Sequence, residues 1–163
     1  MTVLERWGLA RAKRELACMM AATAVVLAAA AGCGGASGAT AVTSTPQQAA
    51  AHPCRLVTQA QAASALHVAL QAPREAPLGP TCVLQAKSGP VVGTLAVQRG
   101  DLSQVSARAV GLMMATEAGR ATYCGTLGQP TLWAPLDSGS MLVISAPCND
   151  ARALAAIALR RIS

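Results

Sequence analysis

The stretch CVLQAKSGPVVGTLAVQ, residues 82–98, contains two runs of strand-forming residues with a turn between them. Residues 82–86 and 91–98 are β-branched or alternate apolar with polar side chains, as in strands that bury one face. The four residues between the runs, Lys87 to Pro90, include Gly and Pro and favour a turn. The stretch therefore predicts a β-hairpin.

Helical patterns occur on both sides of this hairpin. Before it, residues 57–70 predict a helix, because residues 58–61 have the form of a capping box and apolar residues then recur at helical spacing. After it, a second helix is expected over residues 101–117, capped by Asp101 or Ser103. The inner face of this second helix would hold Leu102, Val105, Ala109, Leu112, Met113 and Thr116.

The second half of the chain adds further strands and a closing helix. Residues 121–127, 131–134 and 141–146 predict strands, and residues 150–161 predict a helix that follows a turn. Strand hairpins interleaved with helices are typical of α+β domains. The sequence therefore predicts an α+β fold, with an antiparallel sheet and helices packed mainly on one face.

The N-terminus has the three-part layout of an export signal. Four basic residues up to Arg14 precede an uncharged apolar segment, 16–31, which ends in Ala30-Ala31-Gly32-Cys33. That ending resembles the bacterial lipobox, in which small residues let a peptidase reach the backbone before a cysteine that carries a lipid. Residues 1–32 are therefore predicted to be a lipoprotein signal peptide. Cys33 is the predicted lipidation site, and it would hold the exported protein at the extracytoplasmic face of a cell membrane.

Two other interpretations of this segment stay open. Lipoboxes usually carry Leu, Val or Ile where this chain has Ala30, so an ordinary secretory cleavage after Ala31 or further on would give a secreted protein. A retained transmembrane anchor is the third interpretation. A helix of residues 16–31 reaches only roughly 24 Å, however, whereas the hydrocarbon core is about 30 Å thick.

The segment after the signal differs in composition from the rest of the chain. Residues 34–53 are mainly Gly, Ala, Ser, Thr, Gln and Pro, with no charged residue and almost no large apolar side chain. Such a composition buries too little surface to offset the entropy of ordering, so residues 33–53 are expected to form a flexible tether. The remaining residues, 54–163, suffice for a single α+β extracytoplasmic domain.

Four cysteines lie in that domain: Cys54, Cys82, Cys124 and Cys148. An even number of cysteines in an exported domain predicts disulfides. Three sets of pairs are possible, and Cys54–Cys82 with Cys124–Cys148 is favoured because it joins sequence neighbours without crossing. A zinc site is the competing use of these residues, but the sequence has no Cys-x-x-Cys pair and no His cluster near them.

The opening Pro53-Cys-Arg-Leu-Val-Thr58 and the Ala-rich stretch to Leu70 resemble the start of small actinobacterial cell-envelope lipoproteins of unknown function. In that group a Cys-x-Leu-Leu-Thr motif begins a helix, and a second cysteine, here Cys82, follows on the first strand. The later stretch TLGQPTLW, residues 126–133, and the closing Ala-rich helix also fit. The chain departs from the group at His67, where Gly usually follows the helix.

This resemblance covers most of residues 54–163 and implies a fold and a location, with no reaction attached. Related extracellular modules with two disulfides resemble, more distantly, the sensor domains of receptor kinases.

Composition and motifs argue against several classes of function. After residue 32 the chain has nine basic and five acidic residues, which are scattered, and only Tyr123 and Trp133 as aromatic residues. Such a surface has no stacking platform for nucleic-acid bases. The nucleophile-elbow, zinc-protease and Walker patterns are missing, His52 lies in the expected tether, and His67 lies at a helix edge. A non-enzymatic protein without metal or cofactor is expected.

The candidate binding residues are Trp133, Met113 and Met114. Trp133 would either line a ligand groove or partner interface, or fill a core otherwise made of Ala, Val and Leu, and the core role is favoured. The two methionines would edge an adaptable apolar cleft. Met113, however, is at helical spacing with Val105 and Leu112, so it is expected in the core.

Two functions remain for a protein held at the membrane through Cys33. The first is a ligand-binding or sensor-like lipoprotein that holds a lipid, a peptide or a cell-wall fragment in a cleft, and it is slightly favoured because a helix-covered curved sheet readily leaves one. The second is a structural lipoprotein that docks on another envelope protein without a small ligand. A large apolar cavity would favour the first function, and a flat apolar patch the second.

Overall fold

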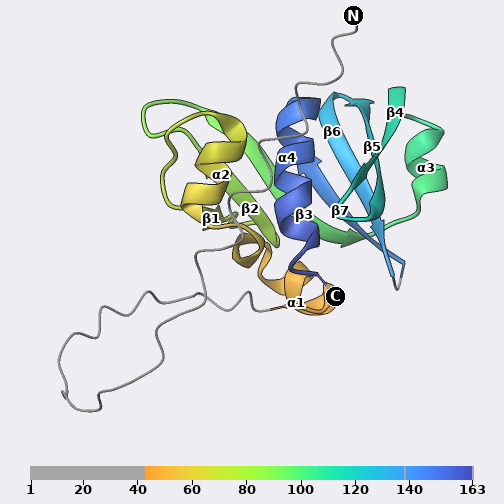
Figure 1. Cartoon of the computed structure of the whole chain (residues 1–163), viewed down its shortest axis with the longest axis horizontal. Coiled ribbons are helices and arrows are strands. Elements are labelled where there is room, and N and C mark those ends of the chain that lie inside the picture. Colours follow the sequence, from red (N-terminus) through yellow and green to blue (C-terminus); the bar gives the residue numbers. More distant parts are fainter. Residues whose placement is uncertain (1–42, 138, 163) are drawn as a thin grey trace, which may run out of the picture. The chain divides into compact units, whose positions relative to one another are not determined.

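An antiparallel sheet forms the centre of the domain (Figure 1). The computed structural model describes residues 43–137 and 139–162. The expected signal peptide, Cys33 and the first part of the expected tether lie outside the described residues. The fold class expected from the sequence, α+β with an antiparallel sheet and two disulfides, is confirmed.

Seven strands make up the sheet, and every neighbouring pair is antiparallel. They are β1 (Arg74–Glu75), β2 (Thr81–Gln85), β3 (Val91–Arg99), β4 (Val110–Glu117), β5 (Arg120–Leu127), β6 (Gln129–Leu136) and β7 (Ser140–Ser145). Their order across the sheet is β1-β2-β3-β7-β6-β5-β4. The predicted hairpin is therefore present as β2 and β3, and β7 lies between β3 and β6 in the middle of the sheet.

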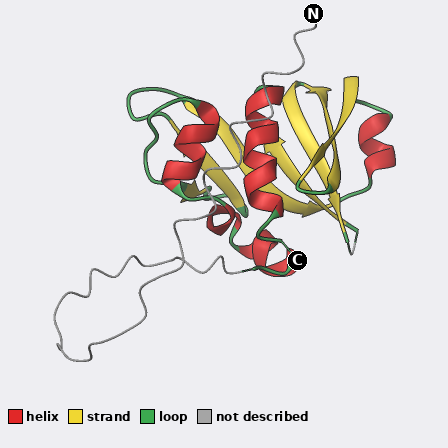
Figure 2. Ribbon diagram, viewed as in Figure 1, coloured by secondary structure: helices red, strands yellow, loops and turns green. Residues whose placement is uncertain are grey.

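Helices cover mainly one face of the sheet (Figure 2). The longest, α4 (Cys148–Leu159), runs across that face, and α2 (Gln59–Leu66) packs beside it. α1 (Pro46–Ala51) and the 3-10 helix η2 (Pro53–Leu56) pack together against β3. The short α3 (Leu102–Ser106) lies against the opposite face, as its packing partners show.

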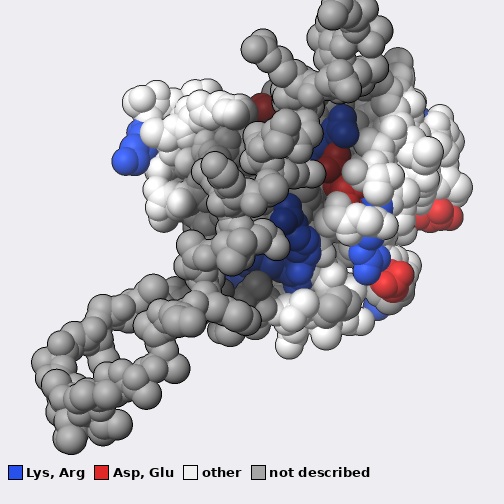
Figure 3. Space-filling model, viewed as in Figure 1, with Lys and Arg blue, Asp and Glu red and all other residues white. Residues whose placement is uncertain are grey.

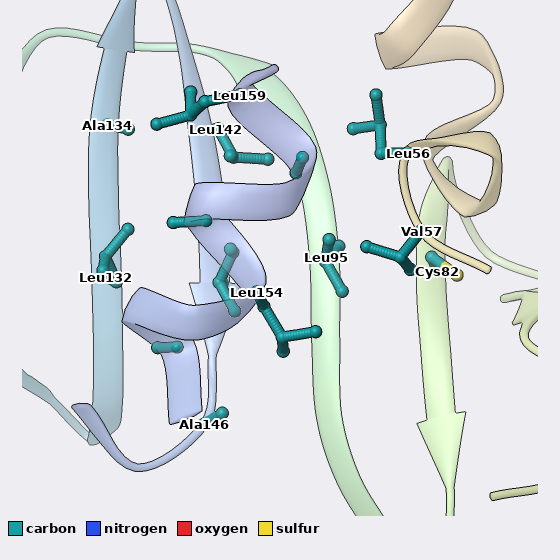
Figure 4. Close-up of a cluster of buried hydrophobic side chains, with 14 of the residues drawn as sticks. Leu56, Val57, Cys82, Leu95, Leu132, Ala134, Leu142, Ala146, Leu154 and Leu159 are labelled. Atoms are coloured by element: carbon teal, nitrogen blue, oxygen red, sulfur yellow. The ribbon is translucent and has the colours of Figure 1, made fainter. Parts of the chain in front are cut away.

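Alternate residues of β6 and β7 point to opposite faces, so each face has its own apolar cluster. Leu132 and Leu142 face α4 and pack with Leu154 in the main core (Figure 4). Trp133 and Met141 face the other way and pack beneath α3. Each fully buried leucine stabilises the fold by roughly 1.5–3 kcal/mol relative to an exposed one. The main core therefore fastens α4 to the middle of the sheet.

Both disulfides of the favoured pairing are present. Cys54–Cys82 joins η2 to β2, and Cys124–Cys148 joins β5 to the first residue of α4. The paired cysteines are 28 and 24 residues apart in sequence. Closing loops of this length in the unfolded chain stabilises the folded state by about 3.5 kcal/mol each on the chain-entropy model. The disulfides thus connect helical segments to the sheet.

α2 begins where the sequence predicts a helix and ends earlier. Thr58 Oγ1 accepts a hydrogen bond from the Gln61 N–H at 3.2 Å, and Gln61 Oε1 accepts one from the Thr58 N–H at 3.1 Å. The predicted capping box is therefore confirmed. The helix stops at Leu66 because the next residue, His67, adopts the left-handed conformation with φ 53°.

The helix expected over residues 101–117 is wrong for most of its length. Only α3 is helical, with Asp101 as its N-cap, whose side chain accepts a hydrogen bond from the Ser103 N–H at 2.9 Å. Residues 110–117 form strand β4 instead, with Gly111 at φ 66° where the register with β5 shifts. β4 is an edge strand exposed on both faces, so it lacks the alternation typical of strands, and pairing with β5 overrides the helical spacing.

The folded domain begins before residue 54. Thr45 and Gln48 form a capping box at the start of α1, with hydrogen bonds of 3.0 and 3.3 Å. Ala49 is 1% exposed and belongs to the main core. The segment expected as a tether is therefore helical over residues 46–51 and packs on the domain.

Candidate functional site

An apolar strip lies along the β4 edge of the sheet. β4 is the outermost strand, so only its β5 side is paired among the described residues. Four apolar side chains here are exposed: Val110 (74%), Met113 (62%), Met114 (73%) and, at the end of β5, Leu127 (45%). We call these four residues the β4 strip. Apolar side chains exposed together on one edge are typical of an interaction surface.

The two methionines of the β4 strip lie on opposite faces of the sheet. Met113 is opposite Cys124 of β5, whose side chain reaches α4 through the second disulfide. Met114 is opposite Tyr123, which in turn is opposite Trp133 on the α3 face. Residues opposite each other on antiparallel strands share a face. The strip therefore offers apolar contacts on both sides of the edge.

A tight turn, a close strand contact and an ion pair hold β4 in place. Ala118 and Gly119, with φ 51° and 78°, form the turn to β5. Gly125 of β5 lets β4 approach closely, because a Cβ at this position would lie 3.1 Å from a carbonyl oxygen of β4. Arg152 Nε donates to Glu117 Oε1 at 2.7 Å and so joins α4 to the end of β4. The edge is therefore held in position along its length.

Trp133, in contrast, is a core residue. Its side chain is 3% exposed and packs with Val105 of α3 and Met141 of β7. The favoured interpretation of Trp133 as a core residue is confirmed. The expectation for Met113 was wrong, because the residue lies in an edge strand and its side chain is exposed.

Val110 and Leu127 are surface residues that sequence reasoning did not identify as candidates. Both were hidden by the assignment of residues 101–117 to a helix, because a helix there leaves no sheet edge. The sequence did carry a signal for the hairpin. Gly111 interrupts the helical pattern, and Ala118-Gly119 separates two runs of similar length, as in a two-residue hairpin turn.

An open groove of about 530 Å³ lies between the start of α3 and the β6–β7 hairpin. Asp101 is its acidic residue, and its pKa is lowered because the carboxylate accepts hydrogen bonds from the backbone N–H and the hydroxyl of Ser103. This carboxylate already serves as a helix cap, so its contribution to the groove is structural. The groove is lined by Gly100, Asp101, Leu102, Gln104, Pro135, Leu136, Gly139, Ser140 and Met141.

The described residues contain no group of three or more His, Cys, Asp or Glu side chains placed to hold a metal ion. His52 Nδ1 lies 3.3 Å from Glu75 Oε1, and this exposed contact joins the start of η2 to β1. His67 is exposed at the end of α2. The two histidines therefore lie at separate places on the surface.

The two disulfides indicate a protein of an oxidising, extracytoplasmic compartment. Within the part of the chain that the structure describes, no helix has the length and apolar character needed to cross a membrane. Comparison of the chain with protein-family models, curated proteins and solved structures gives no match.

Proposed function

We propose that this protein is a lipid-anchored envelope protein that docks on a second envelope protein through the β4 strip. The observation that carries the proposal is the character of this edge. Residues 110–116 contain no charged side chain, while Val110, Met113 and Met114 are each more than half exposed. Proteins usually protect edge strands with charges, proline, bulges or a covering segment, and within residues 110–116 β4 has the register shift at Gly111 but no charge and no proline. An edge that stays apolar and open is suited to a partner.

A partner strand would pair with β4 and cover its apolar side chains in one step. The outer N–H and C=O groups of β4 would bond to the added strand, as in β-augmentation. Methionine side chains are flexible and adapt to the surface that covers them. A stable interface buries roughly 800 Å² on each partner, more than four side chains supply. The partner is therefore expected to extend onto α3 or the β5–β6 turn.

Photo-crosslinking in the cell tests the docking. A photoreactive amino acid at Met114 is expected to give one discrete adduct with another envelope protein, because this side chain is 73% exposed on the edge. The same group at Lys87, exposed in the β2–β3 turn, is the matched control and is expected to give none. Equal adducts from both positions, or an adduct that Met113→Lys leaves unchanged, would contradict the proposal.

The lipid anchor is the second part of the proposal. It is supported by the Ala30-Ala31-Gly32-Cys33 sequence and by disulfides that suit an exported protein. Cys33→Ser is expected to abolish incorporation of a labelled fatty acid, because the thioether needs the thiol. If the variant keeps the label, Cys33 is not the lipidation site, and if the wild-type chain takes none, the protein is secreted or anchored otherwise.

Ligand binding by a sensor-like domain is the second candidate function. The observation in its favour is the groove beside α3, which joins apolar walls from Leu102, Leu136 and Met141 to the polar start of that helix. Native mass spectrometry of the exported protein would then detect a bound mass that leaves on unfolding. A protein mass without ligand would leave docking as the function.

A further inference from the structure

The two ends of the described domain lie side by side. The Ser44 N–H donates to the carbonyl oxygen of Arg161 at 2.6 Å, and Ser44 pairs with Ile162 in a parallel bridge. The segment that carries Cys33 precedes Ser44 in the sequence and therefore joins the described domain at this end. A lipid on Cys33 would attach the domain to the membrane through this end.

Arginines gather at this end. Arg161 donates from Nη1 to the carbonyl oxygen of Arg55 at 2.9 Å and from Nη2 to Gln61 Oε1 at 2.8 Å, which joins the end of α4 to η2 and α2. Arg160 follows α4 directly and is exposed, as is Arg55. Figure 3 shows a continuous area of basic atoms over the lower end of α4. We call Arg55, Arg160 and Arg161 the arginine cluster.

Within residues 43–137 and 139–162, the arginine cluster makes no ion pair. Among the described residues, no carboxylate lies within 4.0 Å of its three guanidinium groups. Glu75 is the acidic residue of the neighbouring β1, and it is paired with His52 at 3.3 Å. This part of the surface is therefore positively charged.

Leu78 lies at the same end of the sheet and is fully exposed. It is in the turn that precedes Thr81, and Thr81 pairs with Ala96 of β3. Because β2 and β3 are antiparallel, this turn lies at the Arg99 end of β3. Arg99 is opposite Ser140, where β7 begins. α4 follows β7 and runs in the opposite direction along the helix-covered face of the sheet. The C-terminal end of α4 therefore lies at this end too. An apolar loop tip therefore lies on the same side as the arginine cluster.

We propose that this end of the domain lies on the membrane, with the arginine cluster on anionic lipid headgroups and Leu78 at the interface. The proposal rests on the lipid anchor proposed above. About ten residues separate Cys33 from Ser44, and even fully extended they span at most roughly 35 Å. The anchored domain therefore stays close enough to the surface for a weak contact to form. Arginine suits this contact because its guanidinium group matches phosphate geometry.

This orientation leaves the β4 strip free for a partner. Val110 is opposite Thr126, next to the β5–β6 turn, and so lies at the end of the sheet where α4 begins. The arginine cluster lies where α4 finishes. A domain that rests on the arginine cluster therefore presents Val110 and Leu127 away from the membrane.

Vesicle binding by residues 34–163 without the lipid tests this contact, since these residues include the whole compact unit, Ala39–Ser163. The chain is expected to co-sediment with vesicles that contain phosphatidylglycerol and not with pure phosphatidylcholine. Each basic residue near an anionic surface strengthens binding about fivefold, so Arg55→Gln with Arg160→Gln should weaken it about 25-fold. Leu78→Ser should weaken it further.

Lys87→Gln with Arg108→Gln is the matched control, because it removes the same charge from exposed residues at the other end of the sheet. It is expected to change binding by less than about twofold. An equal loss in both double variants, or no binding of the unsubstituted chain to anionic vesicles, overturns the proposal. Failure of the Cys33 labelling would instead overturn the anchor, while vesicle binding would still test the arginine cluster, because this experiment uses no lipid group.

Discussion

His67 ends α2 in the left-handed region, with φ 53° and ψ 32°. This conformation costs a residue with a Cβ roughly 1–2 kcal/mol, and glycine adopts it without that cost. His67→Gly also raises the entropy of the unfolded chain, so we expect a net gain of about 0.5–1 kcal/mol in the free energy of unfolding. Urea denaturation followed by circular dichroism measures the change.

Ser64→Gly is the matched control for this prediction. Ser64 is a solvent-exposed residue within α2. The backbone there is right-handed, so glycine relieves no backbone strain. A loss of about 0.5 kcal/mol is expected there. If both glycine variants lose stability alike, position 67 is not strained.

For single residues, burial was predictable where side-chain size favours the core, and not where it depends on a strand's position in the sheet. Trp133 was expected in the core because the chain has few other large side chains to fill one, and it is 3% exposed. Met113 was expected in the core from its spacing and is 62% exposed. Its exposure follows from the position of β4 at the edge of the sheet. The spacing of apolar residues along the chain carries no information about the order of the strands.

Among the elements, those with strong local signals were predicted well. The β2–β3 hairpin, α2 with its capping box, and the strands β5, β6 and β7 lie close to the residues expected for them. β4 was missed because both of its faces are partly exposed, so apolar and polar residues do not alternate. Its conformation is set by pairing with β5, a tertiary effect that overrides local preference.

Gly125 gives a test of how closely β4 must approach β5. A Cβ at this position would lie 3.1 Å from the carbonyl oxygen of Val110 and 3.3 Å from the Cα of Leu112. Backbone atoms cannot move aside as a side chain does, so Gly125→Ala is expected to lower the free energy of unfolding by about 1–3 kcal/mol. Hydrogen exchange of the β4 amides should accelerate as well.

Gly89→Ala is the control for this effect. Gly89 lies in the β2–β3 turn, and a Cβ there would meet only the Cβ of Ala86 at 3.4 Å, an ordinary contact. Its stability is expected to change by less than about 0.5 kcal/mol. Unchanged β4 exchange in Gly125→Ala would show that this strand tolerates a wider spacing, and the β4 strip would then be less well positioned for a partner.

At the scale of the whole molecule, the two ends of the sheet have different characters. One end joins Ser44 to Ile162 and carries the arginine cluster and Leu78. The other end carries Val110 and Leu127 of the β4 strip. If the protein is held by its N-terminal side, the arginine cluster would be directed toward the membrane, and the apolar side chains of the β4 strip would be directed toward a partner.

This arrangement depends on α1 being part of the folded domain, and Ala49 tests that. Its side chain is 1% exposed in the main core, so Ala49→Glu would bury a charge without a partner. We expect a loss of at least about 2 kcal/mol in the free energy of unfolding, measured by guanidinium denaturation. Gln47→Glu is the control, because Gln47 is exposed in the first turn of α1, where a negative charge is tolerated or slightly favourable.

The outcome decides how far the domain could move from the anchor proposed at Cys33. If Ala49→Glu unfolds at a lower denaturant concentration than Gln47→Glu, α1 belongs to the cooperative unit and the chain between Cys33 and the domain is only about ten residues long. If the two variants unfold alike, α1 does not contribute to stability. The tether would then extend to residue 53 and reach roughly 70 Å, and the arginine cluster would no longer be held near the membrane.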